Sequence, residues 1–167
     1  MSRKVLQMQR QIALSRVKVN YQMDCMWRIV IEGQPDNLDL FSREVSYGKG
    51  TIESDTINLR TGDLNSPTKK EAGSVSVVFN DDDNGSISEF INSLQDKIFN
   101  DDGTQNLPVD YLFKLTIYRL KDDGTERLDA QWSVYVEENN DYSGNNDSRT
   151  ELGTFSATFK KYKSIGN

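Results

Sequence analysis

The chain contains no histidine and only one cysteine among its 167 residues. Without histidine it lacks the commonest general base, the commonest metal ligand and the partner that activates serine and cysteine nucleophiles. A closed zinc site built from cysteine and histidine is excluded for the same reason. Cys25 has no second cysteine to pair with, which excludes an intramolecular disulfide and is consistent with folding in a reducing cytosol.

Long apolar runs are also missing. No segment approaches the roughly 18 apolar residues of a transmembrane helix, so we expect no membrane span. The basic N-terminus is not followed by an apolar segment, so we expect no secretory signal. The length suits one domain that can bury its own core.

The charge is unevenly distributed along the chain. The net charge is −6, yet residues 1–23 hold five basic residues and no acid, which leaves −11 for the remainder. An acidic body argues against a nucleic-acid-binding surface, because phosphate contacts need clustered lysine and arginine. We predict a basic N-terminal arm over residues 1–24, either disordered or an amphipathic helix with Val5, Met8 and Ile12 on one face.

Alternating apolar residues from residue 25 onward predict six or seven strands. The clearest ones cover residues 26–31, 74–80, 111–120, 128–136 and 152–162, and Leu38–Tyr47 fits a further strand or an irregular edge. Trp27 and Trp132 stand at inward positions and are expected in the core. Residues 121–124 form a hairpin turn with an Asp-Gly pair. Residues 48–73 are the least patterned stretch, with a short apolar alternation over residues 51–60, and are expected to form an extended loop or a splayed hairpin.

One helix is predicted inside the β pattern, from Ser86 to Phe99. Ser86 and Glu89 have the spacing of a capping box. The apolar face that this helix would bury comprises Ile87, Phe90, Ile91, Leu94 and Ile98. We therefore predict a mainly β fold for residues 25–167: a two-sheet antiparallel β-sandwich or flattened barrel with one flanking α-helix, and the N-terminal arm or helix outside it.

Two Asn- and Asp-rich segments partly match a calcium-binding loop. Counting from Asn80, the twelfth position holds Ile91 where a glutamate ligand is needed, and counting from Asn139 it holds Thr150. Turn formation explains the Asn, Asp and Gly residues without an ion. We therefore expect no metal site.

Acidic residues near strand ends could in principle form a glycosidase-like pair. They are Asp110, Asp129, Glu137 and Glu138, but with 26 acidic residues in the chain such pairs arise by chance. Gly48-Lys49-Gly50-Thr51 lacks the full spacing of a phosphate-binding loop. We expect no catalytic residue and no cofactor, and therefore no enzyme.

Three segments and the order of elements carry a resemblance to a known family. Residues 71–81 lead directly into the predicted helix, and residues 132–136 and 153–159 form the last strands. In this order they resemble the tube proteins of contractile phage tails of the T-even type, a family related to the type VI secretion tube protein. The resemblance spans roughly residues 25–162 and rests on pattern and order, because this family has no diagnostic short motif.

The resemblance implies a structural subunit of a phage tail tube. Six copies would form a ring, and stacked rings would form a conduit for viral DNA inside a sheath, with assembly in the host cytoplasm and a final location in the virion tail. A baseplate protein that starts the tube has the same fold and stays an alternative. From another class, a monomeric β-sandwich that binds a ligand such as a carbohydrate also stays open.

Three surface roles follow as expectations from this reading. The N-terminal arm docks on another subunit. Ring stacking uses the charged middle segment, namely Glu53, Asp55, Arg60, Asp63, Lys69 and Lys70. The lumen is lined by polar strand positions, namely Lys114, Thr116, Asp129, Gln131, Ser133, Thr154, Ser156 and Thr158, and is net negative, although acids placed outside against a basic sheath would leave it neutral.

Overall fold

The computed structural model describes residue 11 and residues 26–140 and 153–163. The predicted N-terminal arm, apart from residue 11, lies outside the described residues. The elements in chain order are β1 (Trp27–Ile31), α2 (Leu38–Phe41), β2 (Ser42–Tyr47), β3 (Ile52–Leu59), β4 (Gly62–Lys70), β5 (Ser74–Asn80), α3 (Ser86–Asp96), α4 (Pro108–Tyr111), β6 (Phe113–Leu120), β7 (Glu126–Asn139) and β8 (Thr154–Lys161).

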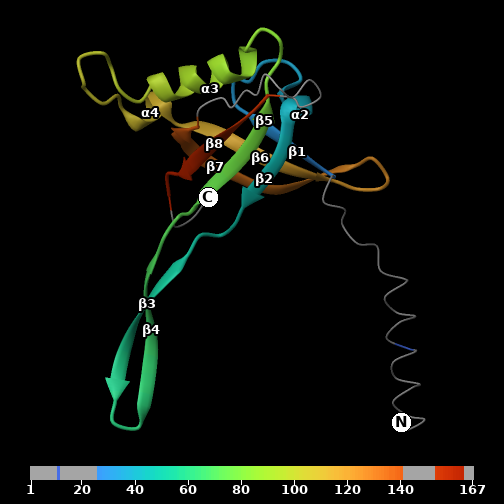
Figure 1. The fold of residues 1–167 in the computed structure, drawn as a ribbon. Helices are drawn as coiled ribbons and strands as arrows, with labels where there is room; N and C mark the ends of the chain where they lie inside the picture. Colours follow the sequence, from blue (N-terminus) through green and yellow to red (C-terminus); the bar gives the residue numbers. More distant parts are fainter. Residues whose placement is uncertain (1–10, 12–25, 141–152, 164–167) are drawn as a thin grey trace, which may run out of the picture.

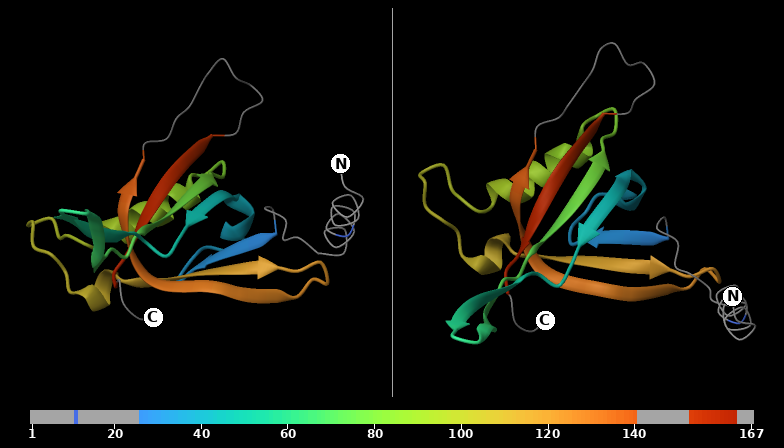
Figure 2. Two further views of the ribbon diagram at one scale, coloured as in Figure 1. Left: turned by 90° about the horizontal axis from the view of Figure 1, so that it is seen from below. Right: turned by 60° about the horizontal axis from the view of Figure 1, so that its bottom comes forward.

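The described strands form two antiparallel sheets, as the sequence predicted. The larger sheet has six strands in the order β1-β6-β7-β8-β5-β2, and β3 and β4 form a separate two-stranded sheet. Strand β7 is 14 residues long. Its first part pairs with β6 and its last part with β8, so one strand joins the two halves of a bent sheet. The halves run in different directions and do not close into a barrel (Figure 2).

The core lies on the inner face of the bent sheet. Alternate residues of β1, β5, β6 and β8 point into it, as their period of two predicts. Aromatic pairs connect the strands: Phe79 stacks on Phe155 with ring centroids 5.5 Å apart, and Phe113 meets Phe159 edge to face at 5.9 Å. Trp27 and Trp132 are partly buried against this cluster, which confirms their predicted packing.

Helix α3 lies over the core of the larger sheet (Figure 1), and its main strand contacts are with β7. Ile87, Ile91 and Leu94 are buried, and Phe90 is partly buried against the same cluster. The helix ends at Asp96, three residues before the predicted end. Ile98, in the turn that follows, is nevertheless buried, with an exposed fraction of 8%. Phe99, the last residue of the predicted helix, is 60% exposed.

The predicted capping box at Ser86 and Glu89 is wrong. Gly85 is the N-cap and has φ 72°, so Ser86 is already the first helical residue. The preceding acidic turn satisfies the free backbone N–H groups instead: Ser86 N donates to Asp82 Oδ1 at 2.6 Å and Ile87 N donates to Asp81 Oδ1 at 3.1 Å. One of the two calcium-like segments therefore serves as a helix cap.

Three other boundaries differ from the sequence prediction. Residues 38–41 form the short helix α2, and only 42–47 form a strand. Pro108 starts the short helix α4, which delays β6 to Phe113. Strand β7 continues to Asn139, through positions predicted as loop. None of the helices in the part of the chain that the structure describes is long and apolar enough to cross a membrane.

Candidate assembly surface

The middle of the chain forms a hairpin, β3 and β4, that projects away from the body (Figure 1). This confirms the splayed hairpin among the two predicted forms of residues 48–73. Every residue of the two strands is exposed except Ser66, which is half-buried. An isolated two-stranded hairpin is marginally stable in water, so this one depends on its root and on whatever covers it.

Two glycines hold the root of the hairpin together. Gly50 has φ 86° and Gly73 has φ 74°, values that side chains of other residues rarely accept. A Cβ on Gly50 would lie 2.0 Å from the carbonyl oxygen of Glu71, and a Cβ on Gly73 would lie 2.9 Å from Gly50 Cα. The two legs therefore touch backbone to backbone, and Glu71 N donates to Thr51 O at 2.8 Å just beyond this contact.

The hairpin has two unlike faces near its tip. Ile57 pairs directly with Leu64, and Leu59 lies two residues further on the same face. These three side chains are 50%, 55% and 54% exposed, respectively. The opposite face carries the cross-strand pair Thr56 and Asn65, which share a hydrogen bond of 2.8 Å. One face is therefore an uncovered apolar stripe. Sequence reasoning noticed the alternation of residues 51–60 but gave its apolar members no role.

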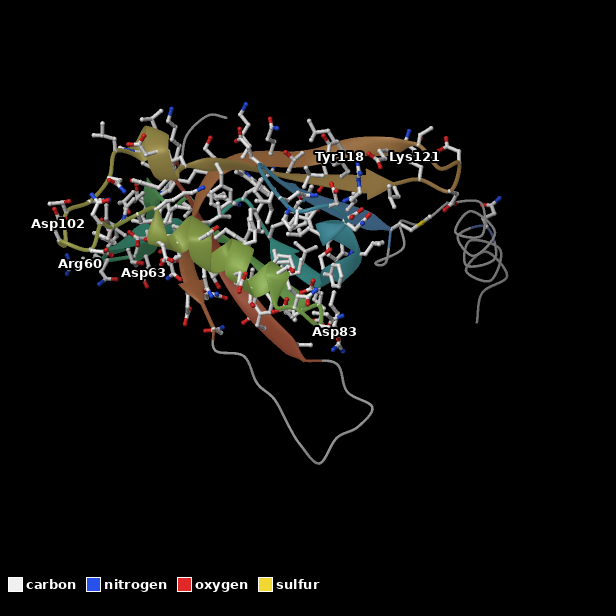
Figure 3. All side chains as sticks on the ribbon, turned by 90° about the horizontal axis from the view of Figure 1, so that it is seen from above. Arg60, Asp63, Asp83, Asp102, Tyr118 and Lys121 are labelled. Carbon is white, nitrogen blue, oxygen red and sulfur yellow. The ribbon has the colours of Figure 1, made fainter. Side chains whose placement is uncertain are left out.

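All six charged residues predicted for ring stacking lie on this hairpin or at its turn and are exposed. Glu53 and Lys69 stand opposite each other in the register of the two strands, and Lys69 Nζ lies 3.5 Å from a carboxylate oxygen of Glu71. Arg60 lies in the turn of the hairpin and Asp63 just after it, and both side chains are exposed (labelled in Figure 3). The hairpin therefore offers charges of both signs around its apolar stripe.

The larger sheet has two edges that could take a further strand. Among the described strands, β1 pairs with β6 alone and β2 pairs with β5 alone. Edge strands expose unpaired backbone N–H and C=O groups, which another chain can satisfy by strand addition. Both edges are short, with five residues in β1 and six in β2. Short edges limit uncontrolled pairing while leaving room for a specific neighbour.

The residues predicted to line a lumen are only partly arranged as one exposed wall. On the outer face of β6 and β7, Lys114 pairs with Ser133 and Thr116 pairs with Gln131. Lys114, Gln131 and Ser133 are exposed, but Thr116 is 5% exposed and accepts a hydrogen bond of 3.1 Å from Gln131. The remaining members on β8, namely Thr154, Ser156 and Thr158, are half-buried on the other half of the bent sheet.

Asp129 does not share the outer face of β6 and β7, because β7 has a β-bulge at this residue. Ile117 pairs with Ala130 and Tyr118 with Leu128, so Asp129 is the extra residue between two paired positions. Its side chain is 16% exposed and lies 3.1 Å from Nε of Arg119, and it also accepts a hydrogen bond from the hydroxyl of Tyr47. These partners, the Tyr47 hydroxyl first, lower the pKa of Asp129. The sequence carries no clear signal of the bulge.

Two of the other candidate groups, Glu137 and the Gly48 segment, have structural partners. Glu137 Oε1 lies 3.3 Å from Nζ of Lys160, and the Gly48 carbonyl accepts a hydrogen bond from Lys161. Within the ranges that the structure describes, no group of three or more Cys, Asp or Glu side chains is placed to hold a metal ion. Most of the second calcium-like segment, from Asp141 onward, lies outside those ranges.

Comparison with known proteins identifies the fold but no family. No family model matches the chain, and no curated protein matches it. Solved structures do match. One match is a chain of the sheath–tube complex of PVC, an extracellular contractile injection system, in the extended state. Its sequence is 15% identical to this chain and the TM-score is 0.57. The match covers 89% of this chain and 93% of that chain.

Two further structures agree with the first. A chain of the PVC sheath/tube terminator in the extended state is 15% identical with a TM-score of 0.58, and 87% of this chain and 96% of that chain are covered. A chain of the six-fold symmetrised baseplate of the anti-feeding prophage is 8% identical with a TM-score of 0.53, over 87% and 91% of the two chains. The protein therefore has a fold found in tube, terminator and baseplate complexes of contractile injection systems.

Proposed function

We propose that this chain is a structural subunit of the tube of a contractile tail or injection apparatus and works by self-assembly. The observation that carries the proposal is the fold match, which covers nearly the whole of both chains. The projecting hairpin supports it independently. Its apolar stripe of Ile57, Leu59 and Leu64 is exposed in the single chain, and water contact with such a stripe is unfavourable until another surface covers it.

The finer form of the proposal has six copies in a ring and rings stacked into a hollow conduit. The baseplate that contains a chain of similar fold was described with six-fold symmetry. In a closed ring each edge strand meets a neighbour, which satisfies the backbone groups of β1 and β2 without leaving an open end. The hairpin projects from the body and is suited to contact the next ring. A sheath and a baseplate would be the outer and terminal partners.

The cargo and the location belong to the same proposal. In a phage the conduit would carry viral DNA, and the subunit would be assembled in the host cytoplasm and end in the virion tail. PVC is an extracellular injection system, so the similar fold also serves outside phage tails. A negative lumen remains a prediction, and the exposed outer positions Gln131 and Ser133 are the places at which to test it.

The decisive experiment is assembly of the purified full-length protein. Electron micrographs and sedimentation velocity should show six-membered rings and stacked tubes of one outer diameter. Replacing Ile57 and Leu64 by serine should remove stacking, because the stripe that the next ring would cover is lost. Replacing Thr56 and Asn65 by alanine on the opposite face is the matched control and should leave stacking intact. A folded wild-type protein that remains a monomer at high concentration rejects the proposal.

A baseplate position is the second candidate, and the match to the baseplate chain favours it specifically. The same micrographs separate the two positions. A main tube protein elongates into long tubes of variable length, whereas a protein that starts the tube stops at single rings or short stacks.

A further inference from the structure

A basic hollow lies between the root of the hairpin and the body. It has a volume of about 600 Å³ and is lined by both legs of the hairpin, by β7 and by the end of β8. Its charged lining consists of Lys49, Lys70, Lys161, Lys163 and Asp129. In a chain whose net charge is −6, four lysines around one hollow are a local reversal of sign.

Lys161 is the unusual member of this lining. It is 5% exposed, its Nζ lies 4.1 Å from the ring centroid of Trp132, and it donates a hydrogen bond to the carbonyl oxygen of Gly48. An ammonium group has three N–H donors. Within the part of the chain that the structure describes, no carboxylate lies within ion-pair distance of it. Burial lowers the pKa of Lys161, which reflects the cost of a charge held away from water.

Asp129 does not provide the missing counter-charge. Its carboxylate is already held by Arg119 at 3.1 Å and by the hydroxyl of Tyr47. A second hollow of about 350 Å³ shares Trp132, Lys161 and Lys163 with the first and adds Lys114. Both hollows that Trp132 lines are therefore rich in lysine, and in the single chain their cationic side chains outnumber the free acidic ones.

We infer that the hollow at the hairpin root is a carboxylate-binding site that receives an acidic side chain from a second copy of this chain. Charge complementarity supports this occupant, because the chain is acidic overall and exposes carboxylates at several turns, among them Asp83 and Asp122. The presence of a second copy rests on the proposed function. Binding of the carboxylate compensates the buried ammonium, which gains a charge-assisted hydrogen bond in a water-poor environment.

A protruding side chain fits this hollow better than a nucleic-acid backbone does. Phosphate tracking uses rows of exposed lysine and arginine, whereas Lys161 is 5% exposed. Both legs of the hairpin line the site, so an occupant would also fix the direction in which the hairpin leaves the body. Contact with one neighbour would then position the hairpin for the next contact.

The test separates this site from a structural role of the same lysines. Lys161→Met removes the buried charge at similar side-chain volume, so the isolated chain should melt at the same or a higher temperature. The protein concentration needed for assembly should rise about tenfold, which is the order expected for one lost charge-assisted contact. Lys49→Glu with Lys163→Glu should weaken assembly in the same way. Lys97→Glu with Lys121→Glu makes the same change of net charge at exposed sites away from the hollow and should assemble like the wild type.

Four results would overturn the inference. Normal assembly of both hollow variants rejects the site and leaves the tube function intact. Equal loss of assembly in the Lys97 and Lys121 control shows a general charge effect and also rejects the site. A wild-type chain that stays monomeric removes the proposed function and the second-copy occupant together. Hollow variants that assemble normally but no longer bind a labelled DNA duplex assign the lysines to phosphates instead.

Discussion

Gly50→Ala should disturb the direction of the hairpin far more than the stability of the body. The added Cβ would lie 2.0 Å from the carbonyl oxygen of Glu71, so the two legs must separate by about 1.4 Å to regain ordinary contact. Across strands about 4.8 Å apart, that separation corresponds to a rotation of roughly 16°. Over the 8 residues of β3, roughly 26 Å of strand, the tip would move by about 8 Å.

The expected cost to the fold is small by comparison. An alanine held at φ 86° costs about 1–2 kcal/mol, and each kcal/mol lowers Tm by about 2–4 °C in a domain of this size. We therefore expect Tm to fall by about 2–8 °C while stacking into tubes is lost, as measured by differential scanning calorimetry and by electron micrographs. Gly48→Ala is the matched control, because a Cβ there meets nothing within 4 Å. Wild-type tube lengths in Gly50→Ala would refute the reasoning.

Three further predictions concern the body. Leu94→Ala should lower the free energy of unfolding by about 2–5 kcal/mol in denaturant titrations. Phe99 is 60% exposed, so Phe99→Ala should change the free energy of unfolding by less than about 0.5 kcal/mol. Equal effects of the two substitutions would contradict the burial of α3. Hydrogen bonds from the backbone and hydroxyl of Ser86 lower the pKa of Asp82, so the stability that Asp82 contributes is present at neutral pH and is lost as the pH falls through that lowered pKa. The melting curves of the wild type and Asp82→Asn should therefore differ near neutral pH and converge in acid; a constant difference would exclude the linkage. Asp129→Lys should lower Tm, because it sets an ammonium group beside Arg119 and Arg127. Ser133→Lys on the exposed outer face should leave Tm unchanged. Equal Tm values in the two variants would mean that the Asp129 contacts carry no stability.

The sequence determined the local structure wherever one periodicity held without interruption. Val75, Val77 and Phe79 alternate in β5, and all three are buried, because a regular strand turns every second side chain to the same face. Ile87, Ile91 and Leu94 recur at helical spacing and are buried in α3 for the corresponding reason. The absence of histidine and of a second cysteine excluded whole classes of chemistry before any fold was known.

Tertiary structure decided the features that depend on irregular backbone. The bulge at Asp129 interrupts the alternation of side chains along β7. The sequence on either side of Asp129 does not show that the strand register changes there. The predicted cap was Ser86 with Glu89, whereas the observed cap is formed by Asp81 and Asp82. The difference arises because Gly85 adopts a left-handed conformation that its neighbours do not dictate.

The candidate assembly surface shows the same division. Alternation along residues 51–60 fixed which side chains share a face of the hairpin, but the same alternation would equally describe a strand inside the body. Tertiary structure adds the close approach of Gly50 and Gly73 at the root of the hairpin, and it places the hairpin outside the body with its apolar stripe uncovered (Figure 1). Likewise, Lys161 lies near the end of a strand in the sequence, where lysine is normally solvated. Its burial against Trp132 arises because distant segments meet there, which no local pattern encodes.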